Sequence, residues 1–90
     1  MLVLKYPIPR PNSEFRSFIL MPVDSVKLSV GVQDNELVLW ALVDPMLPQY
    51  QKTLIVVNTG VEIRSMGKYA QFLGTVTMDN GIVWHIWDEY

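Results

Sequence analysis

The segment 26–44 constrains the fold more than any other part of the chain, because it alternates as two β-strands joined by a tight turn would. In its first half, VKLSVGVQ, every second residue is apolar, and all of these residues lie on one side. Asp34 and Asn35 tolerate a positive φ angle and fit the two central positions of a hairpin turn. The second half, ELVLWALVD, then returns alongside the first. The segment therefore predicts one β-hairpin.

A two-residue loop also determines which residues face each other across this hairpin. The predicted core side pairs Val32 with Leu37, Val30 with Leu39, Leu28 with Ala41 and Val26 with Val43. The reverse side carries Val38, Trp40 and Leu42, which are apolar although that side should face water. The second strand therefore needs cover on both sides, from a second sheet, the N-terminal arm or another subunit. Full cover of Trp40 alone is worth about 2–4 kcal/mol of transfer free energy.

A second hairpin is predicted around Asp79-Asn80-Gly81. With all three residues in the loop and Gly81 left-handed, the apolar residues of both strands share one face. They are Phe72, Gly74, Val76, Met78, Ile82, Trp84 and Ile86. Further strand-like segments flank the first hairpin, and no long amphipathic helix is evident. The sequence therefore predicts an all-β fold, a small antiparallel barrel or sandwich of about six or seven strands, as a single domain over residues 1–90.

Prolines at positions 7, 9 and 11 follow the first strand-like segment. Alternate residues of an extended chain direct their amides to the same side, so the three missing N–H groups would lie along one edge. Such an edge cannot template another strand. We therefore expect a blunted edge strand, or an extended arm lying across the domain.

Composition excludes several classes of function. Half of the residues are apolar and 18% are charged, which predicts a folded chain whose apolar excess favours a homo-oligomer. The net charge of −2, with scattered basic residues, argues against binding of duplex nucleic acid. Cysteine is absent, which excludes disulfides, thiolate metal sites and a thiol nucleophile. The N-terminal MLVLKYPIP matches neither a secretion signal nor a membrane span, so we expect a soluble protein.

The sequence nominates no catalytic residue, no cofactor and no metal site. The acidic residues are dispersed and the glycines are isolated, so neither a metal cluster nor a glycine-rich phosphate loop is predicted. The one histidine, His85, lies in a strand between tryptophans. Thr75 and Thr77 are available there to hydrogen-bond a neutral imidazole. We therefore expect a protein that is not an enzyme.

Two groups of residues are suited to binding. Arg64, Ser65 and Lys68 form the only local concentration of anion-binding side chains, although an ordinary solvated loop has the same composition. The predicted ligand site comprises Arg64, Ser65, Lys68, Tyr69, His85 and Trp87. The predicted interface comprises Trp40, Met46 and Leu47. Met46 and Leu47 occupy a loop, where they either fold back under the domain or form a contact surface.

Five short motifs are distributed along the chain. They are KYPIP at 5–9, LWALVDP at 39–45, NTG at 58–60, FLGTV at 72–76 and VWHIW at 83–87. Together they resemble a family of short phage and prophage proteins of unknown function. The resemblance spans nearly the whole chain and implies a phage origin, with the host cytoplasm as the place of action. It supplies no residue role to carry over.

Three functions are compatible with that implied origin. In the preferred hypothesis, a homo-oligomer acts against host defence by sequestering a small anionic signal, such as a cyclic or ADP-ribose-type nucleotide. Arg64, Ser65 and Lys68 would hold the phosphate, and Trp87 or Tyr69 would stack on the base. In the second, the protein docks on a host defence or replication complex through its apolar loop or a strand edge. In the third, it is a minor structural or assembly component of the virion.

Overall fold

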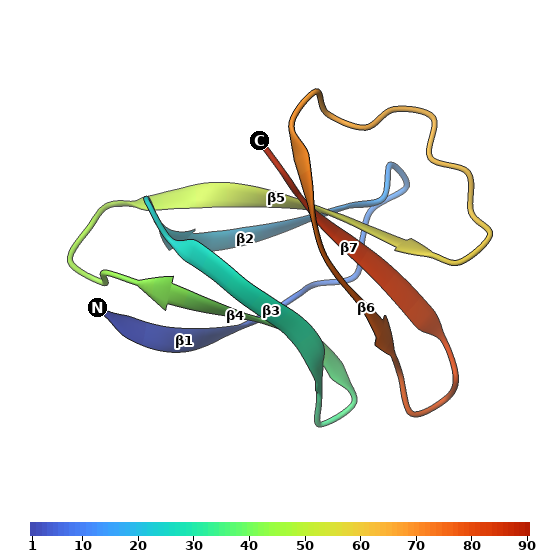
Figure 1. The fold of residues 1–90 in the computed structure, drawn as a ribbon, viewed down its shortest axis with the longest axis horizontal. Helices are drawn as coiled ribbons and strands as arrows, with labels where there is room; N and C mark the ends of the chain where they lie inside the picture. Colours follow the sequence, from blue (N-terminus) through green and yellow to red (C-terminus); the bar gives the residue numbers. More distant parts are fainter.

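The computed structural model describes residues 1–90 and contains seven β-strands and no helix. The strands are β1 (Leu2–Pro7), β2 (Arg16–Pro22), β3 (Val26–Gln33), β4 (Glu36–Val43), β5 (Gln49–Asn58), β6 (Ala70–Thr77) and β7 (Val83–Glu89). They form two antiparallel sheets, one in the order β1-β4-β3 and one in the order β2-β5-β7-β6 (Figure 1). The predicted all-β fold is confirmed, and the arrangement is an open sandwich. The structure contains no candidate membrane-spanning helix.

The hydrophobic core lies between the two sheets. Its buried members come from both inner faces and from the arm that follows β1: Ile8, Ile19, Met21, Leu37, Leu39, Ala41, Val43, Leu54, Val56, Val76 and Ile86. Strand β4 supplies every second residue to this core, as the alternation of its sequence predicts. Each fully buried aliphatic side chain contributes about 1.5–3 kcal/mol relative to an exposed one. The core of the sandwich therefore depends most on β4 and on its partners in the facing sheet.

The central hairpin turns where the sequence predicts it. Asp34 and Asn35 have φ angles of 52° and 62°, as a two-residue turn of this type requires. The predicted pairing is confirmed from Gln33, opposite Glu36, as far as Ser29, which lies opposite Trp40. Side chains on the two strands therefore alternate as expected over this half of the hairpin.

The other half of the hairpin departs from the prediction. A β-bulge at Leu28 shifts the register, so that Lys27 lies opposite Ala41 and Val26 lies opposite Leu42. The predicted inward orientation of Val26 and Leu28 is therefore wrong, and these side chains are 51% and 50% exposed. The physical reason is that one extra residue in a strand reverses the faces of all residues beyond it. Lys27 faces the interior instead.

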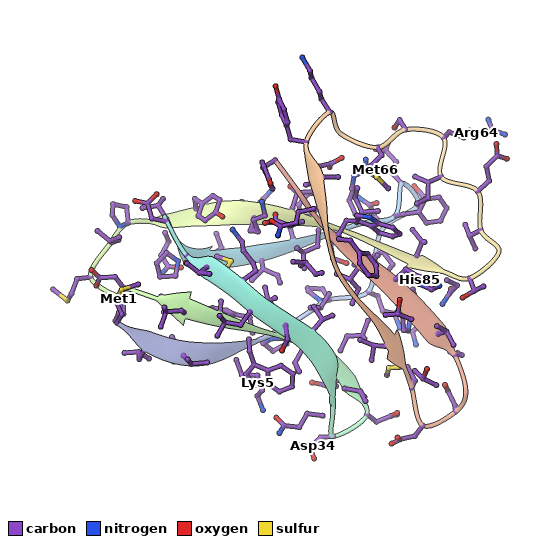
Figure 2. The ribbon with its side chains drawn as sticks, viewed as in Figure 1. Met1, Lys5, Asp34, Arg64, Met66 and His85 are labelled. Atoms are coloured by element: carbon purple, nitrogen blue, oxygen red, sulfur yellow. The ribbon has the colours of Figure 1, made fainter.

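The reverse side of the hairpin is covered from within its own sheet. The ring of Trp40 lies against Gly31, where a Cβ atom would be 2.8 Å from the ring. Lys5, on β1, donates a 2.5 Å hydrogen bond to Gln33, on β3, beside the hairpin turn (Figure 2). Val38, which lies on the same face of β4 as Trp40, is only 2% exposed. The predicted need for cover is therefore met at Val38, while Trp40 stays half-buried.

The second hairpin has the predicted three-residue loop. Gly81 is left-handed, with φ at 88°, and the Met78 N–H donates a 2.8 Å hydrogen bond to the Ile82 carbonyl. The pairing then continues as predicted as far as Gly74, which lies opposite Ile86. The longer loop thus places the apolar residues of this part of the hairpin on one face.

A second bulge, at Leu73, interrupts this hairpin. Phe72 consequently pairs with Trp87 on the outer face of the sheet and is 53% exposed, so its predicted place on the core face is wrong. Gln71 lies opposite Asp88 on the inner face. As in the central hairpin, the extra residue reverses the alternation and carries a polar side chain inward.

The proline segment is both an edge strand and an arm. Pro7 ends β1, and the chain then crosses towards the other sheet, so Pro9 and Pro11 lie outside any strand. The arm is held by a 2.9 Å hydrogen bond from the Ile8 N–H to a β4 carbonyl, and by a 2.7 Å bond from the Ser17 hydroxyl to the Pro9 carbonyl. The expectation that three prolines line one edge is therefore wrong, because the chain leaves the sheet after the first.

A long connection joins β5 to β6 (Figure 1), and the Glu89 carboxylate is one of the groups that hold it to the four-stranded sheet. Glu89 accepts two 2.8 Å hydrogen bonds from the Arg16 guanidinium and a third, also 2.8 Å, from the Gly67 N–H. Arg16 also donates to the Ser65 carbonyl at 3.1 Å. The hydrogen bond from Arg16 is the main cause of a lowered pKa of Glu89.

Replacing Glu89 with glutamine should weaken the protein and reduce its sensitivity to acid. Because the pKa of Glu89 is lowered in the folded state from 4.5, its ionised form stabilises the fold above that pH. This stability is lost as the pH falls through the lowered pKa. We expect E89Q to cost on the order of 1–2 kcal/mol at pH 7, since the pair is partly open to solvent.

The measurement is urea unfolding at several pH values between neutrality and about pH 3. The matched control is E62Q, because Glu62 lies in the same connection and is exposed. Equal pH dependence of E89Q and the unchanged protein would contradict the assigned role of Glu89.

Candidate functional site

Three charged side chains meet inside the sandwich, at the end where β3 begins and β7 ends. The Asp88 carboxylate forms an ion pair with the Lys52 ammonium, and both side chains are only 4% exposed. The Lys27 ammonium lies 3.4 Å from the other carboxylate oxygen. Lys52 and Asp88 belong to the four-stranded sheet and Lys27 to the three-stranded sheet, so the cluster joins the two sheets by charge. Lysine and aspartate are rarely buried this deeply unless they are paired.

Regular alternation carries two of these residues inward. Lys52 shares a face of β5 with Leu54, and Asp88 shares a face of β7 with Ile86. The sequence reasoning missed both, although a charged residue in step with core residues of a strand was a usable signal.

Lys27 and Gln71 also line this end of the sandwich, and the alternation of their strands does not predict their position. Lys27 and Gln71 lie on the inner faces of their sheets only because a bulge, at Leu28 and at Leu73, separates each residue from the turn of its hairpin, and Gln71 is still exposed there. In unbroken strands, both side chains would point to the outer faces. Bulges of this kind are common where a strand must redirect a side chain into a site.

The two lysines are held very differently. The Lys52 ammonium donates a 3.0 Å hydrogen bond to the Glu89 carbonyl, pairs with Asp88 and lies 5.1 Å from the centre of the Tyr90 ring. Its hydrogen-bonding capacity is therefore used. The Lys27 ammonium has only longer contacts, including 3.3 Å to the Tyr50 hydroxyl oxygen, and its side chain is 15% exposed. Lys27 is thus the cation that a ligand can engage.

The cluster lines a cleft of about 620 Å³ that is open to solvent. The lining residues are Val23, Asp24, Ser25, Val26, Lys27, Tyr50, Lys52, Gln71, Asp88 and Tyr90. The Tyr50 hydroxyl accepts from Lys27, so its own proton is available, and the exposed Gln71 carries two further amide donors. Asp24 is exposed at the rim, whereas Asp88 is already neutralised by lysine. The free donors of the cleft suit an oxyanion.

An aromatic platform, formed by Tyr69 and Tyr90, borders this cleft. The two rings are nearly parallel, with an interplanar angle of 7° and centroids 6.5 Å apart. Both side chains are exposed, and the Lys68 ammonium lies 5.6 Å from the centre of the Tyr69 ring. Offset stacking of this kind leaves ring faces on which a planar ligand group can stack.

The structure divides the predicted anion-binding group. Arg64 and Ser65 line a separate groove on the β5–β6 connection, and Lys68 lies apart at the aromatic platform. The Arg64 side chain extends outward from this connection (Figure 2). The groove contains three carboxylates, from Glu14, Glu62 and Glu89, against the two guanidinium groups of Arg16 and Arg64. Its charge is therefore less favourable for an anion than that of the buried cluster.

Two predicted residues, His85 (Figure 2) and Trp87, lie on the outer face of the four-stranded sheet. His85 is hydrogen-bonded through Nδ1 to the Thr75 hydroxyl at 2.9 Å, as expected, and through Nε2 to the Thr59 hydroxyl at 2.6 Å. Trp87 packs edge to face against Phe72, with ring centroids 5.3 Å apart. Neither residue lines the charged cleft, and both imidazole nitrogens have partners.

The predicted interface residues have different environments. Met46 is 89% exposed, whereas Leu47 and Trp40 are half-buried. Asp44 organises the loop, since its carboxylate accepts a 3.0 Å hydrogen bond from the Met46 N–H and its carbonyl accepts one of 3.1 Å from the Leu47 N–H. Of the two alternatives for this loop, Leu47 thus folds back and Met46 points into solvent.

Removing the Asp88 carboxylate alone should destabilise the fold more than removing both the Asp88 carboxylate and the Lys52 ammonium. D88L leaves Lys52 buried without a counter-charge, which costs about 3–5 kcal/mol. In the double variant K52M/D88L, both charges are replaced by apolar groups, and we expect most of that loss to be recovered. Urea unfolding of the single and double variants measures the coupling. Additive losses in the double variant would show that the pair is not coupled.

Comparison with protein-family models gives a match over the whole chain. Searches of curated proteins and of solved structures find no significant similarity. A family model described as a domain of unknown function (DUF7352) matches residues 1–90. The match covers every strand of the sandwich and every residue of the charged cleft. The chain therefore belongs, over its whole length, to the DUF7352 family of domains of unknown function.

Proposed function

We propose that this protein is a non-enzymatic binding protein that holds a small, phosphate-bearing nucleotide in the charged cleft. The observation that carries the proposal is the state of Lys27. A bulge turns this lysine into the interior, yet it makes only long contacts there and stays partly exposed. A cation that is brought inward and left loosely held is suited to an incoming anion.

The cleft can supply a phosphate with several donors at once. The Lys27 ammonium, the Tyr50 hydroxyl and the Gln71 amide all line it. Lys52 keeps the Asp88 carboxylate neutralised, so this carboxylate repels an anion less than a free one would. Hydrogen bonds to charged groups are worth about 1.5–3 kcal/mol each, which is enough for a phosphate to compete with the existing long contacts.

The aromatic platform supports a nucleotide rather than phosphate alone. Tyr90 belongs both to the platform and to the lining of the cleft. A base stacked on Tyr90 would therefore have its phosphate within reach of Lys27. Stacking of a base on an aromatic side chain contributes about 1–3 kcal/mol. In this proposal Tyr69 keeps the stacking role expected from the sequence, now through its contact with Tyr90.

The resemblance to phage and prophage proteins gives this proposal a setting. A phage origin would put the protein in the host cytoplasm, where binding a nucleotide without converting it would remove a signal from host defence. His85 is the one histidine of the chain, and it does not line the charged cleft, so the cleft has no imidazole that could act on a bound nucleotide as a general base. We therefore propose sequestration of a cyclic or ADP-ribose-type nucleotide as the activity.

Substitution of Lys27 should show whether the nucleotide binds in the charged cleft or at the loop that contains Arg64. We expect ADP-ribose or a cyclic nucleotide to bind the unchanged protein and K27Q to weaken binding roughly ten-fold or more, since a charge-assisted contact is lost. R10Q is the matched control, because it removes a positive charge from the proline arm and leaves the cleft unchanged. Isothermal titration measures each affinity. Y90L should weaken the nucleotide but not inorganic phosphate.

Native mass spectrometry of the protein as expressed in bacteria would also detect a ligand that co-purifies with it. If no nucleotide of the panel binds, or if K27Q binds as tightly as the unchanged protein, the proposal fails. Loss of binding in R64Q with full binding in K27Q would instead assign the phosphate to the β5–β6 connection.

A further inference from the structure

β1 is one of the two edge strands of the three-stranded sheet, and it has exposed apolar side chains on both of its faces. β1 pairs only with β4, so its other edge is free (Figure 1). The exposed fractions are 75% for Met1, 43% for Leu2, 54% for Val3 and 36% for Leu4. A free edge of this kind exposes both unpaired backbone groups and apolar surface.

The hydrogen bonds of the arm show which residues of β1 direct their backbone groups outward. The Ile8 N–H donates to the Leu37 carbonyl at 2.9 Å, one step beyond the last register pair of β1 and β4. In an antiparallel pair, bonded and non-bonded positions alternate. The residues bonded to β4 are therefore Leu2, Leu4 and Tyr6, and those directed outward are Val3, Lys5 and Pro7. Pro7, which has no N–H, fits its outward position.

We propose that two copies of this chain pair through their β1 strands, antiparallel, about a two-fold axis at Leu4. The two three-stranded sheets would then form one six-stranded sheet. Val3 of each copy lies opposite Lys5 of the partner subunit, and both residues direct their N–H and carbonyl groups outward. Four hydrogen bonds between the copies result.

The edge of β1 is complementary to itself, which identifies the second copy as the occupant. In this register Leu4 lies opposite its own counterpart at a non-hydrogen-bonded position, where side chains approach most closely. Lys5 lies opposite Val3 of the partner subunit, so the two like charges do not face each other. Pro7 ends the pairing, because it cannot donate the next hydrogen bond. The register thus uses each outward donor of the strand.

The same pairing covers the exposed side chains on both faces of the strand. Leu2 and Leu4 lie on the inner face, opposite Val43 and Ala41 of β4, while Val3 lies on the outer face. A neighbouring β1 strand would bury part of all three. The dimer leaves the charged cleft open, because Lys27 lies on β3, at the opposite edge of the sheet. Dimerisation is therefore independent of the proposed nucleotide site.

A single cysteine at the two-fold axis tests this arrangement. The chain contains no cysteine, so any disulfide in L4C must join two copies. Directly opposed, non-hydrogen-bonded residues have Cβ atoms about 4.5–5.5 Å apart, near the range that a disulfide spans. We expect L4C to form a covalent dimer of twice the 10.4 kDa monomer mass under mild oxidation. L2C is the control, because residue 2 of one copy lies opposite Tyr6 of the partner subunit. The two introduced cysteines would then be too far apart to form a disulfide.

A second variant tests the backbone pairing without a cross-link. The Val3 N–H is directed outward and bonds nothing within the monomer, so V3P removes only intermolecular bonds. We expect the unchanged protein to be a dimer by native mass spectrometry and sedimentation, and V3P to dissociate at least roughly ten-fold more readily. The matched control L20K changes an exposed residue of β2, in the other sheet, and should remain a dimer.

Two results would overturn the proposal. One is an unchanged protein that stays monomeric at concentrations up to about 100 µM. The other is a dimer in which L2C cross-links and L4C does not, since a different register or surface would then join the copies.

Discussion

The sandwich buries the Asp88 carboxylate, and the fold depends on keeping this carboxylate paired with lysine ammonium groups. An ionised carboxylate buried alone costs several kcal/mol, and Asp88 avoids that cost only because ammonium groups approach it from both sheets. Lys52 comes from the neighbouring strand and Lys27 from the facing sheet. The end of the sandwich is therefore held by charge, while the rest of the interior is held by apolar packing. A shift of one sheet against the other would separate Lys27 from the cluster.

The bulge on β3 turns Lys27 towards Asp88, and the two bulges together make one side of the molecule a poor surface for strand pairing. They lie on β3 and β6, the edge strands that run close together along one side of the sandwich. The approach is tight at Gly74, where a Cβ atom would be 2.9 Å from the Val30 side chain. Bulged edges are poor templates for another strand. β1 keeps a regular register and an apolar edge, so the two sides of the three-stranded sheet differ in what they can pair with.

The same asymmetry separates the two proposed activities. The charged cleft lies beside the bulged strands, and the free edge lies beyond β4 on the other side. Membership of a family of unknown function assigns no role to any residue, so both proposals depend on the chemistry of the side chains and of the backbone. The cleft is defined by donors that converge from both sheets, and the edge by backbone groups that have no partner within the chain. Each surface can therefore be tested without disturbing the other.

Local pattern was sufficient for much of the fold. The left-handed turn at Asp34 and Asn35, the three-residue loop ending at Gly81 and the inward set of β4 all follow from preferences that act over a few residues. The same alternation placed Lys52 and Asp88 on core faces, so the sequence held evidence for two of the three charged residues of the cluster. It could not predict where alternation would be interrupted.

Tertiary structure decided the rest. Neither bulge has a signature in VKLSVGVQ or QFLGTV. A bulge is stable only when the side chain that it reverses makes stabilising contacts with the facing strand and the interior. Unbroken alternation would put Lys27 on the outer side of β3 and Phe72 on the core face of β6, and neither holds, because a bulge lies between each residue and its hairpin turn. The sequence by itself determined the strands, the turns and the all-β class, since these depend on neighbours along the chain. Only the packing of the two sheets decided which polar groups meet inside, because a buried carboxylate needs a partner that lies far away in the sequence.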